Sequence, residues 1–288
     1  MHISELLDPK IDYVFKRIFG HEGNEEITGG LISSIIKKEV SNVRLDCNPI
    51  LEKDLFDDKL GILEIKAKID NKINCNIELQ VVDKKNIEKR LAFYWSKLYN
   101  MSIKAGEDYE SLEKGIVILI SDYELESLKE IRKYMTKWNI REEEYPKIIL
   151  TDVLEFYIIE LPKFEKYHQR TDNNCLNLWI KFIKYPGVIE MEETNKEIQK
   201  AKKVLEEISN DKRERYLAEL RQKYIMDQKA TEDAGYDKGL KAGIEQGIEQ
   251  GKRENTVQIA KKMKAQKIEI EIIMQITGLS KEEIMNLE

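Results

Sequence analysis

Residues 62–81 read ILEIKAKIDNKINCNIELQV and contain two segments in which apolar and polar residues alternate. The polar residues 70–72 between them are types that favour tight turns, so the pattern predicts a β-hairpin. If these three residues form the loop, residues equidistant from Asn71 face each other. Glu64 then lies opposite Glu78, and the hairpin has one apolar and one polar face.

The polar face of this hairpin carries Glu64, Lys66 and Lys68 on one strand and Asn74, Asn76, Glu78 and Gln80 on the other. Two carboxylates that face each other across a strand pair repel, and a divalent cation bound between them removes the repulsion. Glu64 and Glu78 therefore indicate a Mg²⁺ site. A solvated polar face on a one-sided sheet is the alternative interpretation of the same alternation.

The segment after the hairpin, residues 86–105, has the spacing of an amphipathic helix. Its apolar stripe consists of Leu91, Tyr94, Trp95 and Leu98, and another edge carries Arg90, Tyr94 and Lys97. Basic residues outnumber acidic ones here, although the chain has a formal net charge of −6. Such a helix either contacts phosphates or presents a solvated basic face. The apolar run at residues 115–120, GIVILI, then predicts a buried strand.

These parts, in this order, resemble the PD-(D/E)XK nuclease superfamily, specifically its branch of recombination-promoting nucleases and transposases. The resemblance covers roughly residues 5–185. The first motif is DPKIDYVFKRIFG from Asp8, with the family residues Asp12, Phe15, Lys16, Phe19 and Gly20 in place. The hairpin contributes GILEIKA and NIELQ, and the next helix contributes R-x-x-x-Y-x-x-K-x-Y from Arg90, followed by Gly106 and Tyr109. The last two motifs are ELPKF from Glu160 and Trp179-x-x-Phe182.

The resemblance implies an α/β fold with a restriction-endonuclease-like core, in which helices flank a mixed β-sheet and a long helical C-terminal extension follows. The expected regions are a nuclease-like domain at residues 1–188, a charged helical arm with a Gly-x-x-x repeat at 189–254, and a helix-turn-helix-like tail at 255–288. Local patterns predict helices at residues 12–19, 24–38 and 174–184 and strands at 43–51, 134–140 and 154–159.

The activity implied by the resemblance is that of a Mg²⁺- or Mn²⁺-dependent DNA endonuclease associated with recombination or transposition. The expected catalytic residues are Glu64, Glu78, Gln80 and Asp12. The expected metal ligands are Glu64, Glu78 and the carbonyl of Leu79. The expected phosphate or DNA contacts are Arg90, Tyr94, Lys97 and Lys66. Asp12 and Lys16 could approach the site from the N-terminal helix. For Asp12, a role at the start of that helix is the alternative.

Two residues depart from the family pattern. Glu64 stands where the family usually has Asp, and Gln80 where the superfamily has Lys. Glutamate is one methylene longer than aspartate, which moves a bound metal by about an ångström and lowers the rate if positioning is tight. A catalytically idle relative that binds DNA or self-associates is therefore the alternative function, and RNA or structured junctions are alternative substrates. Another assignment takes Glu64 and Lys66 as an E-x-K pair, with Asp57 or Asp58 as the first acid.

The composition, with 41% hydrophobic residues and a mean hydropathy of −0.53, is typical of a soluble protein. The sequence has neither a long apolar segment nor a signal peptide, so we expect a cytoplasmic bacterial protein that does not enter a membrane. Cys47, Cys75 and Cys175 are far apart, which argues against a disulfide framework or a structural zinc site. The three histidines are equally scattered and predict no histidine-based metal site.

The C-terminal region has two further patterns. Glycines recur every fourth residue at Gly235, Gly239, Gly243, Gly247 and Gly251. Each weakens a helix by roughly 1 kcal/mol relative to alanine, so the stripe either allows close helix approach in a homodimer or marks a linker. After a basic stretch at residues 252–267, a Thr-Gly-Leu-Ser turn with capping-box spacing from Ser280 to Glu283 predicts a helix-turn-helix. DNA reading and a protein-contact or packing role are both compatible with it, and the short last helix favours the second.

Overall fold

The computed structural model describes residues 5–47, 64–83, 85–167, 174–188 and 195–287. The chain divides into two compact units, Met1–Met226 and Asp227–Glu288. Within the described ranges, every helix is either too short or too polar to span a lipid bilayer.

A mixed sheet of six strands forms the centre of the first unit, in the order β1-β2-β3-β4-β6-β5. The strands are β1 (Val43–Leu45), β2 (Ile65–Ile69), β3 (Ile73–Gln80), β4 (Lys114–Ser121), β5 (Met135–Trp138) and β6 (Leu154–Glu160). In the middle, β3, β4 and β6 are parallel, and the outer pairings are antiparallel. The central strand β4 is almost entirely apolar because both of its faces are buried.

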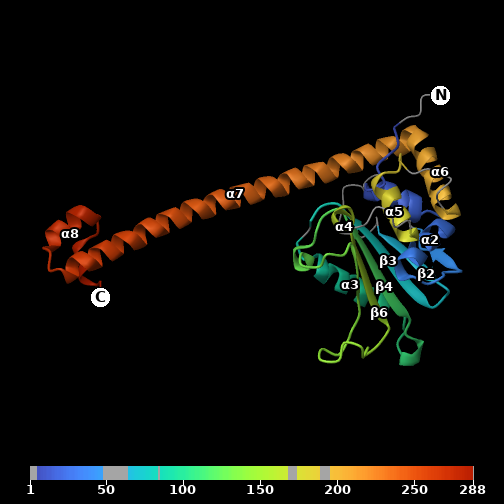
Figure 1. Ribbon diagram of the computed structural model, residues 1–288, viewed down its shortest axis with the longest axis horizontal. Coiled ribbons are helices and arrows are strands. Elements are labelled where there is room, and N and C mark those ends of the chain that lie inside the picture. Colours follow the sequence, from blue (N-terminus) through green and yellow to red (C-terminus); the bar gives the residue numbers. More distant parts are fainter. Residues whose placement is uncertain (1–4, 48–63, 84, 168–173, 189–194, 288) are drawn as a thin grey trace. The chain divides into compact units, whose positions relative to one another are not determined.

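Helices cover both faces of this sheet (Figure 1). One face packs against α1 (Asp12–Phe19), α2 (Glu25–Ile36), α4 (Leu161–Tyr167), α5 (Cys175–Lys184) and α6 (Lys196–Asn210), and the other against α3 (Ile87–Asn100). Phe19, Trp179 and Phe182 are in the larger core, on the first face. The smaller core joins Leu91 of α3 to Leu119 of β4. The expected fold class, a mixed sheet flanked by helices and followed by a long helical extension, is confirmed.

The predicted hairpin forms in the predicted register, with Lys66 opposite Asn76. Its turn uses φ angles of 49° at Asp70 and 57° at Asn71, a left-handed conformation that these residue types tolerate. The strand predicted at residues 43–51 is shorter in the structure, where β1 has only three residues and residues 48–51 lie outside the described ranges.

The other predicted elements correspond to observed ones. The helix predicted at residues 12–19 is α1, with the same bounds, and the predicted strands at 134–140 and 154–159 are β5 and β6. The helix predicted at 86–105 is α3, which ends at Asn100 because a turn follows, in which the amide of Ser102 bonds to the carbonyl of Tyr99.

The charged arm begins with α6, which packs into the first unit through its buried residues Ile198, Ala201 and Leu205. Next comes α7 (Lys212–Ala265), an uninterrupted helix that crosses the boundary between the two units. Its first turns are tied to α1 by Glu214, which accepts hydrogen bonds from Tyr13 and Arg17, and by Arg221, which is ion-paired with Asp12. The start of the arm is therefore part of the first unit, through the buried residues of α6 and the polar contacts of α7.

In the second unit, the end of α7 packs with α8 (Ile270–Thr277) and α9 (Lys281–Met285) around Ala260, Ile273 and Ile284. A glycine with φ 71°, Gly278, ends α8, and Ser280 and Glu283 form the predicted capping box of α9. These three helices have the order of the predicted helix-turn-helix.

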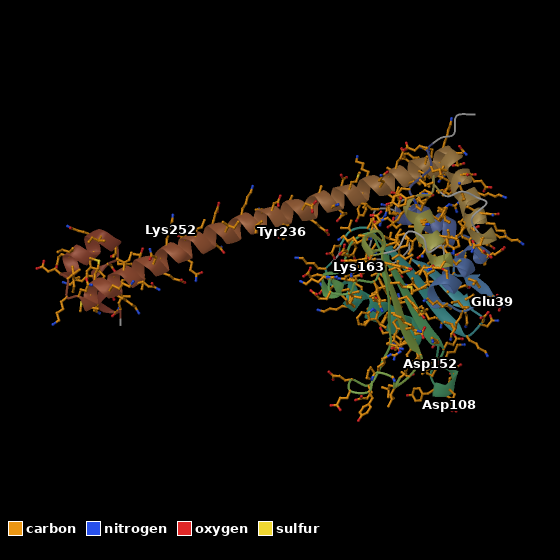
Figure 2. The ribbon with its side chains drawn as sticks, in the orientation of Figure 1. Glu39, Asp108, Asp152, Lys163, Tyr236 and Lys252 are labelled. Carbon is orange, nitrogen blue, oxygen red and sulfur yellow. The ribbon has the colours of Figure 1, made fainter. Side chains whose placement is uncertain are left out.

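The five glycines of the stripe all lie inside α7. A Cβ added to any of them would meet no atom of the described residues within 4 Å. Tyr236, which is 69% exposed, and Lys252 project from the same helix (Figure 2). The stripe is therefore an open helix surface in the second unit.

Candidate functional site

Glu64 and Glu78 come from the two arms of the hairpin and lie on its α3 side. Glu78 belongs to β3, and Glu64 immediately precedes Ile65, which pairs with Ile77. The same register, continued by one residue, sets Glu64 opposite Glu78. Arg90 of α3 interacts electrostatically with both carboxylates. The structure therefore brings the two predicted acids together at one place.

Two side chains of the predicted site bind Glu78, which is only 3% exposed. Arg90 Nη2 donates a hydrogen bond of 2.8 Å to Glu78 Oε1, and Gln80 Nε2 donates one of 2.6 Å to the same oxygen. Burying a carboxylate is costly unless a cation and hydrogen bonds compensate its charge. Arg90 and Gln80 provide that compensation for Glu78.

Tyr94 links the two acids. Its hydroxyl oxygen accepts a hydrogen bond of 2.8 Å from Arg90 Nη2, since the two residues are one helical turn apart in α3. Burial and the negative charge of Glu78 raise the pKa of Tyr94 to about 12, so the hydroxyl stays protonated at neutral pH. Hydrogen bonding by Tyr94 in turn lowers the pKa of Glu64.

Glu64 is less well compensated than Glu78. Burial raises the pKa of its carboxyl group, and the opposing effects of Tyr94, Lys66 and Asn76 offset this only in part. Its Oε1 is buried and accepts no hydrogen bond from the described residues. The binding of a cation stabilises a carboxylate in this condition.

Two lysines approach Glu64 from different elements. Lys66 is two residues further along and lies on the same face of the hairpin. Lys16 belongs to α1 and is 5% exposed. Burial and the charge of Lys66 lower the pKa of Lys16, whereas Glu64 and Asp46 act in the opposite direction. The charge of Lys16 is therefore close enough to interact with that of Glu64, as the place of Lys16 in the N-terminal motif suggested.

Asp12 of the same motif is held elsewhere. Both of its carboxylate oxygens accept hydrogen bonds from Arg221 in α7, with a closest distance of 2.6 Å. Its Oδ1 also accepts a bond from the backbone amide of Tyr13 in the first turn of α1. These contacts correspond to the alternative role of Asp12 at the helix start. The structure does not bring Asp12 into the cluster of Glu64 and Glu78.

A groove of about 610 Å³ opens beside Glu64, between α3 and the hairpin. Lys66 and Lys97, two of the predicted phosphate contacts, line it together with Arg44 of β1. Phe93, also in its wall, is 63% exposed. Basic side chains next to exposed aromatic rings are typical of surfaces that bind a nucleic-acid strand.

The donor atoms at the site suit a hard divalent cation such as Mg²⁺ or Mn²⁺, which prefers carboxylate oxygens and retains several waters. The described residues contain no cluster of three or more His, Cys, Asp and Glu able to hold a metal ion, so Glu64 and Glu78 would act with neutral oxygens. The side chain of Leu79 packs in the core on the opposite face, and its carbonyl stays a predicted ligand. Asp57 and Asp58, the alternative first acids, lie outside the described residues.

Sequence reasoning placed Asn76 on the polar face of the hairpin but gave it no role. In the structure, Asn76 is 1% exposed and lies at the wall of the groove beside Glu64. The alternation of the strand was the available signal, because it puts Asn76 on the same face as Glu78 and directly opposite Lys66.

Comparisons with known proteins identify the family of the chain. A family model described as "PD-(D/E)XK nuclease family transposase" matches residues 9–235. A second model, described as "Rpn/YhgA-like nuclease family, C-terminal HTH domain", matches residues 253–288, which include α8 and α9. No curated protein and no solved structure matches the chain significantly.

Proposed function

Because the chain belongs to the PD-(D/E)XK nuclease family transposases, we propose that it is a metal-dependent DNA endonuclease with its site at Glu64 and Glu78. The observation that carries the proposal is the arrangement of these two acids. Glu78 is buried and bound by Arg90 and Gln80, and the second acid, Glu64, is half-buried and has a buried oxygen that accepts no hydrogen bond from the described residues.

In the proposed reaction, Glu64 and Glu78 would hold a divalent cation, which when bound would supply activation of water and stabilisation of the negative charge on the phosphate. Gln80 orients Glu78 through its hydrogen bond to Oε1. Gln80 carries no charge, so the positive charges that this chain brings near the acids come from Arg90, Lys16 and Lys66. These cations stabilise an anionic phosphate in the way that the lysine of the superfamily would.

The groove and the C-terminal domain support a nucleic-acid substrate. Lys66 and Lys97 line the groove and would contact phosphates next to the scissile bond. The helix-turn-helix family of residues 253–288 favours DNA over RNA as the partner. An association with recombination or transposition follows from the family and is part of the proposal.

Nicking of supercoiled plasmid by the purified full-length protein tests this function. We expect nicking with Mg²⁺ or Mn²⁺ and none with EDTA. Glu78→Gln should reduce the rate by more than about 100-fold, because the variant loses an anionic ligand but keeps its shape. Glu113→Gln is the matched control, since Glu113 is an acid in the wall of the same groove that binds Lys68 and Asn74.

The result also separates this proposal from that of an idle relative. Equal nicking by wild type and Glu78→Gln would reject the site. A wild type that binds DNA but does not nick it with either metal would instead identify a DNA-binding protein without activity.

Self-association through the second unit is a further part of the proposal. Beside the glycine stripe, α7 exposes an apolar row with the same four-residue spacing, namely Tyr236, Leu240, Ile244 and Ile248. Rows of this spacing pack against each other when two helices cross, and glycines allow the close approach. A dimer would place two sites on one DNA molecule, as a double-strand break requires.

Light scattering at tens of micromolar protein tests the dimer. We expect a dimer for the wild type and a monomer for Ile244→Lys, whereas Glu245→Lys on the same helix should remain dimeric. Removing residues 233–288 should likewise give a monomer and shift the products from linear toward nicked plasmid. A monomeric wild type would leave the glycine stripe as a linker.

A further inference from the structure

Asn74 and Asn76 lie on the same strand and the same face of the sheet but differ in their hydrogen bonds. Asn74 is half-buried, and its Nδ2 donates a hydrogen bond of 2.8 Å to Glu113 Oε2. Asn76 is 1% exposed, and neither Oδ1 nor Nδ2 has a hydrogen-bond partner among the described residues. An amide buried without partners costs roughly 1–3 kcal/mol. The described residues leave Asn76 without a hydrogen bond of normal geometry, which points to a ligand that satisfies it.

The position of Asn76 indicates what that ligand is. It precedes Glu78 by two residues on β3, so both side chains lie on one face. Its side chain also lowers the pKa of the neighbouring Glu64 carboxyl group through a hydrogen-bonding interaction outside normal geometry, and it lines the groove that opens beside Glu64. The amide of Asn76 is therefore next to the place where the two acids would share a cation.

We propose that Asn76 is the third side chain of the divalent-cation site and gives its Oδ1 to the cation. This inference rests on the proposed function and deepens it. Amide oxygens are ordinary ligands of Mg²⁺ and related cations. Two carboxylates balance the charge of a divalent cation, and a neutral third donor adds a ligand without adding a third buried negative charge.

Thermal unfolding of the full-length protein, with and without Mn²⁺ or Mg²⁺, tests the inference independently of activity. A cation that binds only the folded state raises Tm, and at a fixed concentration the rise increases with the logarithm of its affinity. Asn76→Leu removes the amide and keeps the volume. Its Tm without metal should equal or exceed that of wild type, because an unsatisfied buried amide is gone, and its affinity for the cation should fall at least about tenfold.

Asn74→Leu is the matched control on the same strand. It loses the hydrogen bond to Glu113, so its Tm without metal should fall, while its affinity for the cation should stay within about twofold of wild type. A second variant, Asn76→Asp, keeps an oxygen at the site and adds a charge. It should unfold at a lower temperature without metal and show a larger metal-induced rise in Tm than wild type.

The outcomes distinguish this inference from the proposed function. If Asn76→Leu keeps the cation affinity of wild type while Glu78→Gln loses it, Asn76 is not a ligand and the two-acid site stands. If Asn76→Leu does not fold, a metal-induced rise in Asn76→Asp no larger than in wild type overturns the inference. A wild type whose Tm does not respond to either metal overturns both proposals.

Discussion

The turn end and the open end of the β2–β3 hairpin carry similar polar residues but hold them differently. At the turn end, Lys68 and Asn74 both bind Glu113, at 2.7 and 2.8 Å. At the open end, Glu64 and Asn76 are packed in the protein with polar atoms that have no hydrogen-bond partner among the described residues. The first arrangement stabilises the fold by itself. In the second arrangement, the polar atoms without partners destabilise the fold, which is typical of a ligand-binding site.

The difference arises from what covers each end. Glu113, just before β4, brings a carboxylate to the turn end, where it binds both Lys68 and Asn74. The open end lies under α3, whose Arg90 binds Glu78, and its groove leaves room beside Glu64. The same strand pair therefore supports a structural cluster and a candidate catalytic cluster a few residues apart.

Removing the cation at each end should give the largest contrast in stability. Arg90→Met removes an ion pair and a hydrogen bond from Glu78, which is 3% exposed, and we expect a loss of about 3 kcal/mol in the free energy of unfolding. Lys68→Met breaks a pair whose side chains are 40% and 23% exposed, and the loss should be below about 1 kcal/mol. Urea unfolding measures both. Equal losses would show that the open end is not the more strongly buried one.

Glu64→Gln should raise the stability of the metal-free protein at alkaline pH. Burial raises the pKa of Glu64 in the folded state. A group whose pKa is higher in the folded state than in the unfolded state stabilises the fold while it is protonated. This stability is fully present below the pKa of the unfolded state and is lost as pH rises through the pKa of the folded state. Wild type should therefore lose stability relative to Glu64→Gln between about pH 5 and about pH 8.

Thermal unfolding at the two pH values, with EDTA present, measures this difference. Glu113→Gln is the control from the turn end, because it removes an acid that binds two partners and should lower Tm at about pH 8. A pH-independent difference between wild type and Glu64→Gln would mean that burial of Glu64 has no energetic consequence.

Glu64→Asp should have the smallest effect. It restores the acid that the family usually has at this position and shortens the side chain by one methylene. Nicking should increase or stay unchanged, and the ratio of the rates with Mn²⁺ and Mg²⁺ should fall, because Mg²⁺ is the more demanding of the two in geometry. Rates of plasmid nicking with each metal measure the effect. A large loss of activity would mean that the site is adapted to the longer glutamate.

The sequence by itself determined the local features. The hairpin register follows from a period of two and from a turn at Asp70 and Asn71 that accepts left-handed backbone angles. The bounds of α1 and the capping box of α9 also depend on neighbours in the chain. The resemblance to the nuclease family followed from the same local motifs, and the family is confirmed.

Only the tertiary structure decided how the residues of these motifs are used. Asp12 and Lys16 are one turn apart in α1, yet Asp12 binds Arg221 of α7 while the charge of Lys16 interacts with that of Glu64. The apolar residues of α6, among them Ile198 and Leu205, are buried in the core of the first unit by helices that are distant in sequence. Whether a polar atom is satisfied depends on partners that are distant in sequence. Periodicity therefore placed Asn76 on the correct face but could not reveal that its amide lacks a partner among the described residues.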